Sequence, residues 1–245
     1  MMLENTSATR SPPFTKVAII GAGFGGIAMA IRLQQQGIHD FILLEKGNEF
    51  GGTWRDNQYP GAACDVQSHL YSLSFAPKSN WSKRYAEAPE IFSYIQDLVN
   101  DYKLRAFCRL NTEVLSAHYQ AERCLWQLQL QDQSILEAQF VIFASGPLHI
   151  PQIPPIPGIE KFQGKVFHSA QWDHTYDLNG KNVASIGTGG SAIQYVPEIA
   201  PQCKQLYVMQ RTAAWIIPRD ERVYHPLEKT LFEKYDWFRK LHRAR

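Results

Sequence analysis

Glycine residues recur at two places in the chain with a spacing that suits the binding of a dinucleotide. The first set, Gly21, Gly23 and Gly26, follows an apolar stretch and precedes a helix-forming one. The first glycine permits a tight turn, the second lets the backbone approach a pyrophosphate, and the third lets helix and strand pack closely. The N-terminus of the helix adds N–H donors and a positive dipole. The segment predicts a dinucleotide site; a glycine-rich turn used only for packing is the alternative.

An acidic residue stands where such a site requires one. Glu45 ends the next apolar stretch, 19 residues after Gly26. At this position a carboxylate hydrogen-bonds a ribose hydroxyl of the nucleotide. Strand, turn, helix, strand and acid therefore follow one another in the order that a nucleotide-binding unit needs.

A second set repeats the pattern with one difference in charge. Gly187 and Gly189 are followed by Ala192, a permitted third small residue, and the next apolar stretch ends in Arg211. An arginine there can pair with the 2′-phosphate of NADPH through two hydrogen bonds, whereas a solvated strand-end arginine is the alternative. Two sites of this kind indicate a flavin in the first, NADPH rather than NADH in the second, and a redox enzyme that passes a hydride between them.

The elements that must position these loops alternate between strands and helices. Short, apolar strands of this type are expected to be parallel and buried on both faces. We therefore predict an α/β fold with two Rossmann-type βαβ domains. Strands are expected at 16–20, 41–45, 125–130, 140–144, 181–186 and 206–210, and helices at 27–36, within 80–102, at 193–199 and from His225 onward.

Proline-rich sequence supplies the domain boundary. Five prolines between positions 147 and 157 forbid a continuous helix and suggest a crossover between domains. We predict a disordered lead-in at 1–15, an FAD-binding domain at 16–150, an NADP-binding domain at 151–224 and a separate helical segment at 225–245. The last helix would carry an apolar stripe of Leu227, Leu231, Tyr235, Phe238 and Leu241, with nothing after it to cover the stripe.

Composition excludes several classes of protein. The chain has 245 residues with 25 basic and 23 acidic side chains, a net charge of +2, which argues against a nucleic-acid partner. No apolar run approaches the ~20 residues of a membrane span. The four cysteines form no CxxC pair, so neither a metal site nor a redox dithiol is expected, and a cytoplasmic protein with reduced thiols is indicated.

The segment between the two glycine loops resembles the fingerprint FxGxxxHxxxW(P/D) of Baeyer–Villiger monooxygenases, a branch of the class B flavin-containing monooxygenases. All fixed positions match: Phe162, Gly164, His168, Trp172 and Asp173. Segments 51–54, 59–65, 68–75, 144–146 and 210–218 are also similar to that family. The resemblance extends over roughly 16–218, most of the chain.

The resemblance implies a role for each matching position. Those expected to bind FAD are Gly21, Gly23 and Gly26 at the pyrophosphate, Glu45 at the ribose, Thr53, Trp54, Arg55 and Asp56 along the flavin, Asp65 and Tyr71 near its ring, and Val114 near the adenine. Those expected to bind NADPH are Gly187, Thr188, Gly189, Gly190, Ser191 and Ala192 at the phosphates, and Gln210 with Arg211 at the 2′-phosphate. Asp65 would be the catalytic acid closest to the chemistry.

The implied reaction is the insertion of one oxygen atom of O2 into a small-molecule ketone, through a C4a-peroxyflavin, to give an ester or lactone. A flavin monooxygenase that oxygenates nitrogen or sulfur is one alternative, although such enzymes usually have Tyr or Phe in place of Trp172. A non-catalytic nucleotide-binding remnant is the other. A disulfide reductase is disfavoured because the chain has no CxxC.

Simpler interpretations exist for several of these residues. His168 is expected to be a domain hinge or a hydrogen-bonded structural histidine, and Trp172 to pack at a domain interface. Asp65 could cap a turn, and Arg55 with Asp56 could form an exposed ion pair of little energetic value. The basic tail at 239–245 is expected to be the polar face of an unfinished helix.

The chain is also shorter than members of the family, which are about twice as long and carry an arginine that stabilises the developing negative charge. No arginine here matches that position. The resemblance therefore implies that the second domain, at 151–224, is truncated and that 225–245 is the start of a helical insertion. We expect an N-terminal portion of a monooxygenase, its missing half absent or supplied by a partner chain, that alone binds FAD weakly or not at all and turns over poorly.

Overall fold

The computed structural model describes residues 12–147, 149–213 and 215–243. Its contacts divide the chain into two compact units, one of Met1–Phe50 with Val99–Pro147 and the other of Gly51–Leu98 with Leu148–Arg245. The break at Pro147 lies close to the predicted boundary at 150. Segment 51–98, which the predicted FAD-binding domain includes, shares more contacts with the second unit. The domain limits stay a prediction.

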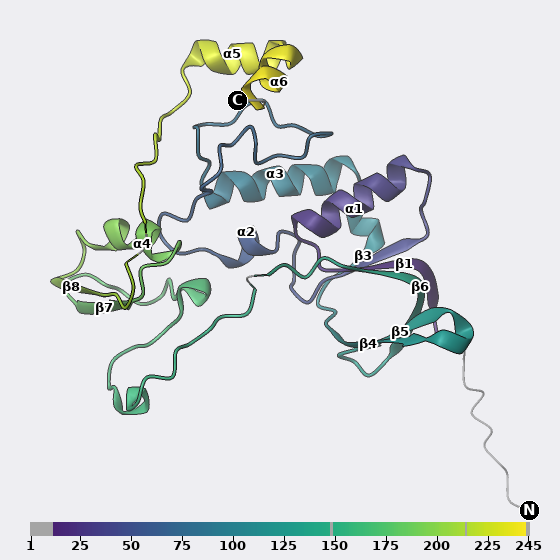
Figure 1. Cartoon of the computed structure of the whole chain (residues 1–245), viewed down its shortest axis with the longest axis horizontal. Coiled ribbons are helices and arrows are strands. Elements are labelled where there is room, and N and C mark those ends of the chain that lie inside the picture. Colours follow the sequence, from purple (N-terminus) through teal and green to yellow (C-terminus); the bar gives the residue numbers. More distant parts are fainter. Residues whose placement is uncertain (1–11, 148, 214, 244–245) are drawn as a thin grey trace, which may run out of the picture. The chain divides into compact units, whose positions relative to one another are not determined.

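The first unit is built on a six-stranded sheet (Figure 1). Parallel pairing joins β1 to β2 and β6, and β2 to β3, whereas β4, β5 and β6 pair antiparallel. Helix α1 packs against β1 and β2. The elements of this unit, in the sheet order β3-β2-β1-β6-β5-β4 with α1 last, are β3 (Cys108–Arg109), β2 (Phe41–Leu44), β1 (Phe14–Ile20), β6 (Ile135–Phe143), β5 (Leu125–Leu130), β4 (Val114–Gln120) and α1 (Phe24–Gln35).

The first predicted βαβ unit is confirmed, with its strand longer than expected. The structure starts β1 at Phe14, where Phe14 and Thr15 pair with Glu137 and Ala138 of β6. These two residues belong to the predicted disordered lead-in, so that prediction is wrong for them, and residues 1–11 lie outside the described part. A cluster of buried side chains on the sheet forms the core of this unit: Ala18, Leu44, Leu128, Leu130, Leu136 and Ala138.

The second unit contains a two-stranded parallel sheet and several helices (Figure 1). The division between the units falls inside helix α3 (Ala88–Asp101). This helix confirms the one predicted within 80–102. The elements are α2 (Thr53–Asp56), α3 (Ala88–Asp101), β7 (Asn182–Ile186), α4 (Ala192–Ile199), β8 (Gln205–Met209), α5 (Pro226–Lys234) and α6 (Asp236–Arg243).

The strand β7 differs from its expected burial. Only Ser185 of this strand is buried, and Ile186 is 54% exposed. The expectation of a strand buried on both faces is wrong here. Parallel strands are buried where helices cover both faces of their sheet. In the described part of the chain β7 and β8 form a two-stranded sheet, whose faces leave Ile186 uncovered.

The C-terminal segment forms two helices where one was predicted. Tyr235 has an extended backbone (φ −123°, ψ 104°), which ends α5 before α6 begins. Helix α5 starts at a capping box, in which His225 Nδ1 accepts from the N–H of Leu227 and Glu228 accepts from the N–H of His225. The buried residue of this segment is Phe232, which lies outside the predicted stripe.

Aromatic rings bind this segment to the rest of the second unit. The His69 ring lies 3.8 Å from that of Phe232 and 5.3 Å from that of Tyr224. Arg243 Nη1 donates to the carbonyl oxygens of His69 (2.6 Å) and Ser72 (3.1 Å). The basic residues predicted to lie on a helix do so as far as Arg243, the last residue of α6, and the last two residues lie outside the described part. No helix among the described residues is long and apolar enough to span a bilayer.

Candidate functional site

The first glycine loop is tightly enclosed by its own unit. Gly21 has φ +103°, a conformation that favours glycine, and its N–H donates to the carbonyl of Leu44 (2.8 Å). A Cβ on Gly21 would lie 2.5 Å from the carbonyl oxygen of Ala144, and one on Gly26 would lie 1.9 Å from that of Gly21. Both positions accept only glycine, because the neighbouring atoms are backbone. The tight turn and close packing predicted for this loop are present.

Glu45 holds the loop in place from the end of β2. Its side chain is buried, with Oε2 accepting from the N–H of Ala22 (2.8 Å) and Oε1 from that of Gly47 (2.7 Å). The carboxylate therefore lies beside the glycine loop, where a ribose-binding acid is required. Val114 begins β4 in the same unit and packs against the core cluster.

The loop fits the dinucleotide that its sequence predicts. Helix α1 begins at Phe24, and its N-cap residue is Gly23, which has no side chain to cap the first turn. The first-turn amides of a helix lack intrahelical partners, so they can bind phosphate oxygens. Residues Gly21, Gly23 and Gly26 would hold the pyrophosphate of FAD and Glu45 its ribose.

The predicted flavin-side residues of the second unit form a short helix and its partner. Trp54 Nε1 donates to the hydroxyl of Tyr71 (3.0 Å), and the two rings meet edge to face with centroids 5.6 Å apart. Burial raises the pKa of Tyr71 above its ordinary value, so its hydroxyl keeps its proton at neutral pH. The structure thus brings together two residues that lie 17 positions apart in the sequence.

Other members of this group lie nearer the surface. Arg55 pairs with Asp56 through Nε–Oδ1 (2.7 Å) and Nη2–Oδ2 (3.0 Å). The Arg55 side chain is only 13% exposed, whereas that of Asp56 is 39% exposed. Thr53, which starts α2, and Asp65 are exposed. The role of Asp65 in catalysis stays a prediction.

The second glycine loop has the same backbone and more open surroundings. Gly187 has φ +100°, and its N–H donates to the carbonyl of Met209 (2.8 Å). A Cβ on Gly187, Gly189 or Gly190 would meet no described atom within 4 Å. Ser191 precedes α4, which begins at Ala192. The loop leaves room for the close approach of a phosphate, so it fits a dinucleotide.

The strand end after β8 carries the residues predicted for the 2′-phosphate. Gln210 Nε2 donates to the hydroxyl of Thr188 (2.9 Å), which joins this strand end to the glycine loop. Arg211 is exposed. It can therefore receive a phosphate group without breaking a buried contact, and these residues would hold NADPH.

The fingerprint residues make structural contacts within the second unit. His168 Nδ1 accepts from the N–H of Ala170 (3.1 Å) and so caps a short 3-10 helix at Ser169–Gln171. The Trp172 ring packs against Phe167 (5.2 Å) and Tyr195 of α4 (5.3 Å). The fingerprint thus adjoins the helix that follows the second glycine loop.

The other fingerprint residues differ in exposure and charge. Phe162 is 62% exposed, and a Cβ on Gly164 would overlap its ring. Hydrogen bonds from Lys165 and Thr175 lower the pKa of Asp173 to about 2. Asp173 is therefore a charged, paired residue and not a proton donor at neutral pH.

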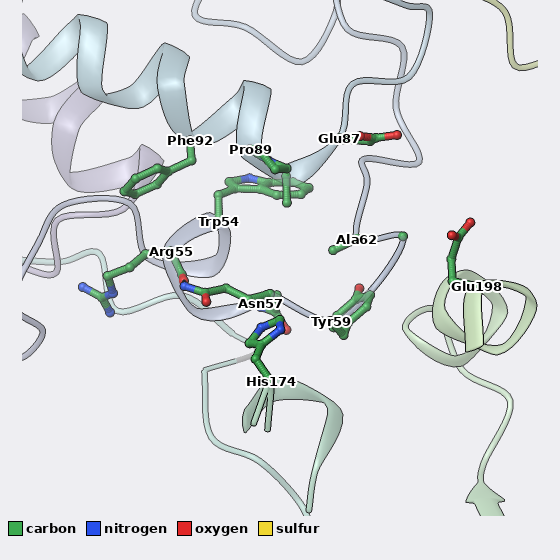
Figure 2. Close-up of a pocket in the computed structure, with 13 residues that line it drawn as sticks. Trp54, Arg55, Asn57, Tyr59, Ala62, Glu87, Pro89, Phe92, His174 and Glu198 are labelled. Carbon is green, nitrogen blue, oxygen red and sulfur yellow. The ribbon is translucent and has the colours of Figure 1, made fainter. Parts of the chain in front are cut away.

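A cavity of about 500 Å3 opens beside α2 in the second unit (Figure 2). Its size is that of sites for small molecules and cofactors. Figure 2 shows Pro89 next to the indole of Trp54, with Phe92 on the same side of the cavity. Its main aromatic and ionisable lining residues are Trp54, Tyr59, Phe92, Glu87, His174 and Glu198. Two predicted flavin-side residues, Trp54 and Arg55, thus line a cavity of suitable volume.

Some residues at this site were not identified from the sequence. Gln194 of α4 hydrogen-bonds the backbone of Ala63, 131 positions earlier, and Arg219 donates to the carbonyl of Cys64. A single glutamine in the first turn of a helix belongs to no motif that we considered. The partners are distant in sequence, so no local pattern reveals these contacts.

Comparison with known proteins identifies the family. Residues 18–233 match the model of the pyridine nucleotide-disulphide oxidoreductase family. The disulphide in that description has no counterpart here, since the cysteines Cys64, Cys108, Cys124 and Cys203 are all free.

Comparison with individual proteins shows which members of this family the chain resembles. A Baeyer–Villiger monooxygenase of Streptomyces coelicolor is 46% identical over 229 residues, which cover 94% of this chain and 44% of that protein. The closed crystal structure of cyclohexanone monooxygenase superposes with a TM-score of 0.87 at 33% identity, over 96% of this chain and 45% of that one. Oxidised steroid monooxygenase bound to NADP gives a TM-score of 0.82 at 36% identity, over 90% and 44% of the respective chains.

The chain spans less than half the length of these relatives. Over that span the match includes both glycine loops and the complete fingerprint. The chain therefore belongs to the pyridine nucleotide-disulphide oxidoreductase family, and within it is a relative of the Baeyer–Villiger monooxygenases.

Proposed function

We propose that this chain is the FAD- and NADPH-binding part of a Baeyer–Villiger monooxygenase, which inserts one oxygen atom of O2 into a ketone to give an ester or lactone. The observation that carries the proposal is the pair of glycine loops whose following strands end in opposite charges, Glu45 and Arg211. A carboxylate suits the ribose of FAD and repels a 2′-phosphate, whereas an arginine binds that phosphate.

Each group of residues has a distinct task in this proposal. The flavin, when bound, supplies the chemistry of oxygen transfer. The first loop and Glu45 orient the FAD, and the second loop with Gln210 and Arg211 orients the NADPH. The Tyr71 hydroxyl, bonded to Trp54 and held in its neutral form by burial, supplies a fixed dipole on the flavin side. Asp65 is the acid proposed to lie nearest the chemistry.

Anaerobic reduction of the flavin tests the cofactor assignment. The chain would be mixed with FAD and then with NADPH or NADH, while the visible absorbance of oxidised flavin is followed. We expect NADPH to bleach the flavin faster than NADH does at equal concentration, because only NADPH carries the phosphate for Arg211. Equal rates, or no bleaching by either, would contradict the proposed cofactor pair.

Product analysis separates the ketone proposal from its alternatives. The reduced mixture would be exposed to 18O2 with cyclohexanone, the ketone named for a structural relative, or with a thioether. A lactone that contains one 18O atom supports the proposal, and Trp172 with Asp173 favours this outcome. A labelled sulfoxide would indicate a heteroatom-oxygenating enzyme. Flavin reduction without either product would support a chain that binds its nucleotides but does not oxygenate a substrate by itself.

A further inference from the structure

Gln194 makes an unusual set of contacts for a side chain beside a nucleotide loop. It is the third residue of α4, one turn after the second glycine loop. Its Nε2 donates to the carbonyl of Ala63 (2.9 Å), and its Oε1 accepts from the N–H of the same residue (3.2 Å). Oε1 also accepts from the Tyr59 hydroxyl (3.0 Å). A side-chain amide that satisfies both backbone groups of one residue fixes that backbone much as a neighbouring strand would.

The segment at 59–65 also lies close enough to α4 to exclude a side chain between them. Gly61 has φ +73°, and a Cβ on it would lie 2.7 Å from Glu198 Cγ and 2.9 Å from the carbonyl oxygen of Gln194. The Tyr59 ring meets that of Tyr195 edge to face at 6.1 Å. The contact between the segment and α4 therefore extends from Tyr59 to Ala63.

Helix α4 is itself joined to the second sheet and to the fingerprint. The hydroxyls of Tyr195 and Ser185, the buried residue of β7, lie 2.8 Å apart. The Trp172 ring packs against the Tyr195 ring, with centroids 5.3 Å apart. Because one helix contacts the glycine loop, the fingerprint and segment 59–65, a restraint on its first turn can reach all three.

Segment 59–65 connects the predicted flavin-side residues. Trp54, Arg55 and Asp56 precede it, and Asp65 is its last residue. Its other side is bound to backbone near α3, through Cys64 N–H to Ala86 O (2.9 Å) and Ala88 N–H to Ala62 O (2.8 Å). The Gln194 side chain thus joins this segment to α4, the helix that follows the second glycine loop.

We propose that Gln194 is a positioning residue that couples occupancy of the second glycine loop to the order of segment 59–65. The proposal rests on the proposed binding of NADPH. A dinucleotide phosphate at the N-terminus of α4 restrains its first turn, and Gln194 transmits this restraint to Ala63. Coupling between binding and order is reciprocal, so an ordered segment also favours the dinucleotide.

Amide hydrogen exchange of the whole chain, with and without NADP+, tests this proposal. In the unmodified chain we expect NADP+ to slow exchange in peptides that cover 59–65. In Gln194→Ala this slowing should be lost, and exchange without ligand should be roughly tenfold faster because the bonds to Ala63 are gone. The Kd for NADP+, measured by calorimetry, should rise about fivefold or more.

Two further variants keep the test specific. Gln202→Ala removes an exposed glutamine that bonds the carbonyl of Glu198, and it should behave as the unmodified chain does. Tyr59→Phe removes one of the bonds to Gln194 and should give a partial effect. If circular dichroism shows that Gln194→Ala is unfolded, Tyr59→Phe serves as the test variant in its place.

The outcomes distinguish this proposal from the proposed function. NADP+ that slows exchange equally in the unmodified chain and in Gln194→Ala would overturn the coupling. An unmodified chain that binds no NADP+ would contradict the proposed function. In that case hydrogen exchange without ligand still tests the positioning role of Gln194. If exchange at 59–65 in both Gln194→Ala and Tyr59→Phe equals that of the unmodified chain, the positioning role would be overturned.

Discussion

The two glycine loops have nearly the same backbone in very different surroundings. Gly21 and Gly187 have φ values of +103° and +100°. The N–H of each donates a hydrogen bond of 2.8 Å to the carbonyl oxygen of the last residue of the neighbouring strand. The first loop follows β1, which lies between β2 and β6, whereas β7 pairs with β8 alone in the described residues. The motif therefore sets the shape of the turn, and the strands around it decide how tightly the turn is packed.

The charged residues that complete the loops differ in the same way. Glu45 is buried and accepts two backbone hydrogen bonds, so it belongs to the structure of its loop. Arg211 is exposed and is available for a ligand. A substitution in the first loop should therefore affect folding, and one in the second should affect binding.

The largest expected effect is a difference in stability between glycine substitutions in the tightly packed first loop and in the open second loop. Gly26→Ala places a methyl group against the carbonyl of Gly21 and should destabilise the chain by about 3 kcal/mol or more. Gly190→Ala meets no described atom and should change stability by less than about 1 kcal/mol. Urea denaturation of both variants measures the difference. Equal losses of stability would show that the two loops are packed alike.

Acid should affect the second unit through His69, which belongs to neither glycine loop. Burial, together with His242, Arg239 and Arg243, lowers the pKa of His69 to about 4. Since the unfolded pKa is near 6.5, the folded state binds the proton less well, so stability is complete above about pH 6.5 and falls as the pH drops toward 4. A His69 pKa that falls from 6.5 to about 4 on folding corresponds to a loss of stability of at most about 3 kcal/mol.

Hydrogen exchange at pH 7 and pH 4.5 in His69→Phe and the unmodified chain measures this effect. Differences between the two proteins are expected in peptides at 69–75 and in α5 and α6, and not in β1. After correction for the intrinsic effect of pH, an acid response that is unchanged in His69→Phe would show that another group causes it.

A smaller effect is expected when the buried carboxylate is changed. Glu45→Gln leaves one acceptor oxygen for two backbone donors, so one of the N–H groups of Ala22 and Gly47 loses its partner. The cost should be roughly 1–3 kcal/mol. Thermal unfolding would be compared with that of Arg211→Ala, for which a change below about 0.5 kcal/mol is expected. A neutral Glu45→Gln would mean that the acid does not hold its loop.

The smallest effect concerns selectivity between the two nicotinamide cofactors. Arg211→Ala should weaken NADPH binding about tenfold, which corresponds to about 1.4 kcal/mol, and leave NADH binding unchanged. Lys204→Ala removes an exposed positive charge near the other end of β8 and is the matched control. Equal losses for NADPH and NADH would assign Arg211 to something other than the 2′-phosphate.

Local patterns in the sequence predict most of the elements that carry the loops. An apolar run followed by spaced glycines is enough to place β1 and α1, and likewise β7 and α4. Strand β4 was missed because its sequence, Val114–Gln120, alternates weakly between apolar and polar residues. The break at Tyr235 was missed because a helical spacing of apolar residues continues across it.

Long-range contacts set the limit of what the sequence can predict. The bond from Gln194 to Ala63 joins residues 131 positions apart, and the burial of His69 depends on Phe232 and Tyr224. The exposure of the β7 side chains depends on which elements cover the faces of its sheet, and not on the residues of β7 alone. These features follow from packing, which no periodicity in a single sequence contains.

A fluorescence titration of FAD with the chain tests most directly whether the two loops have separate tasks. The unmodified protein would be compared with Glu45→Gln and Arg211→Ala, with FAD quenching as the signal. We predict saturable binding that is weakened in Glu45→Gln and unchanged in Arg211→Ala. The account would be contradicted if the loss of Arg211 weakens FAD binding as much as the change at Glu45 does.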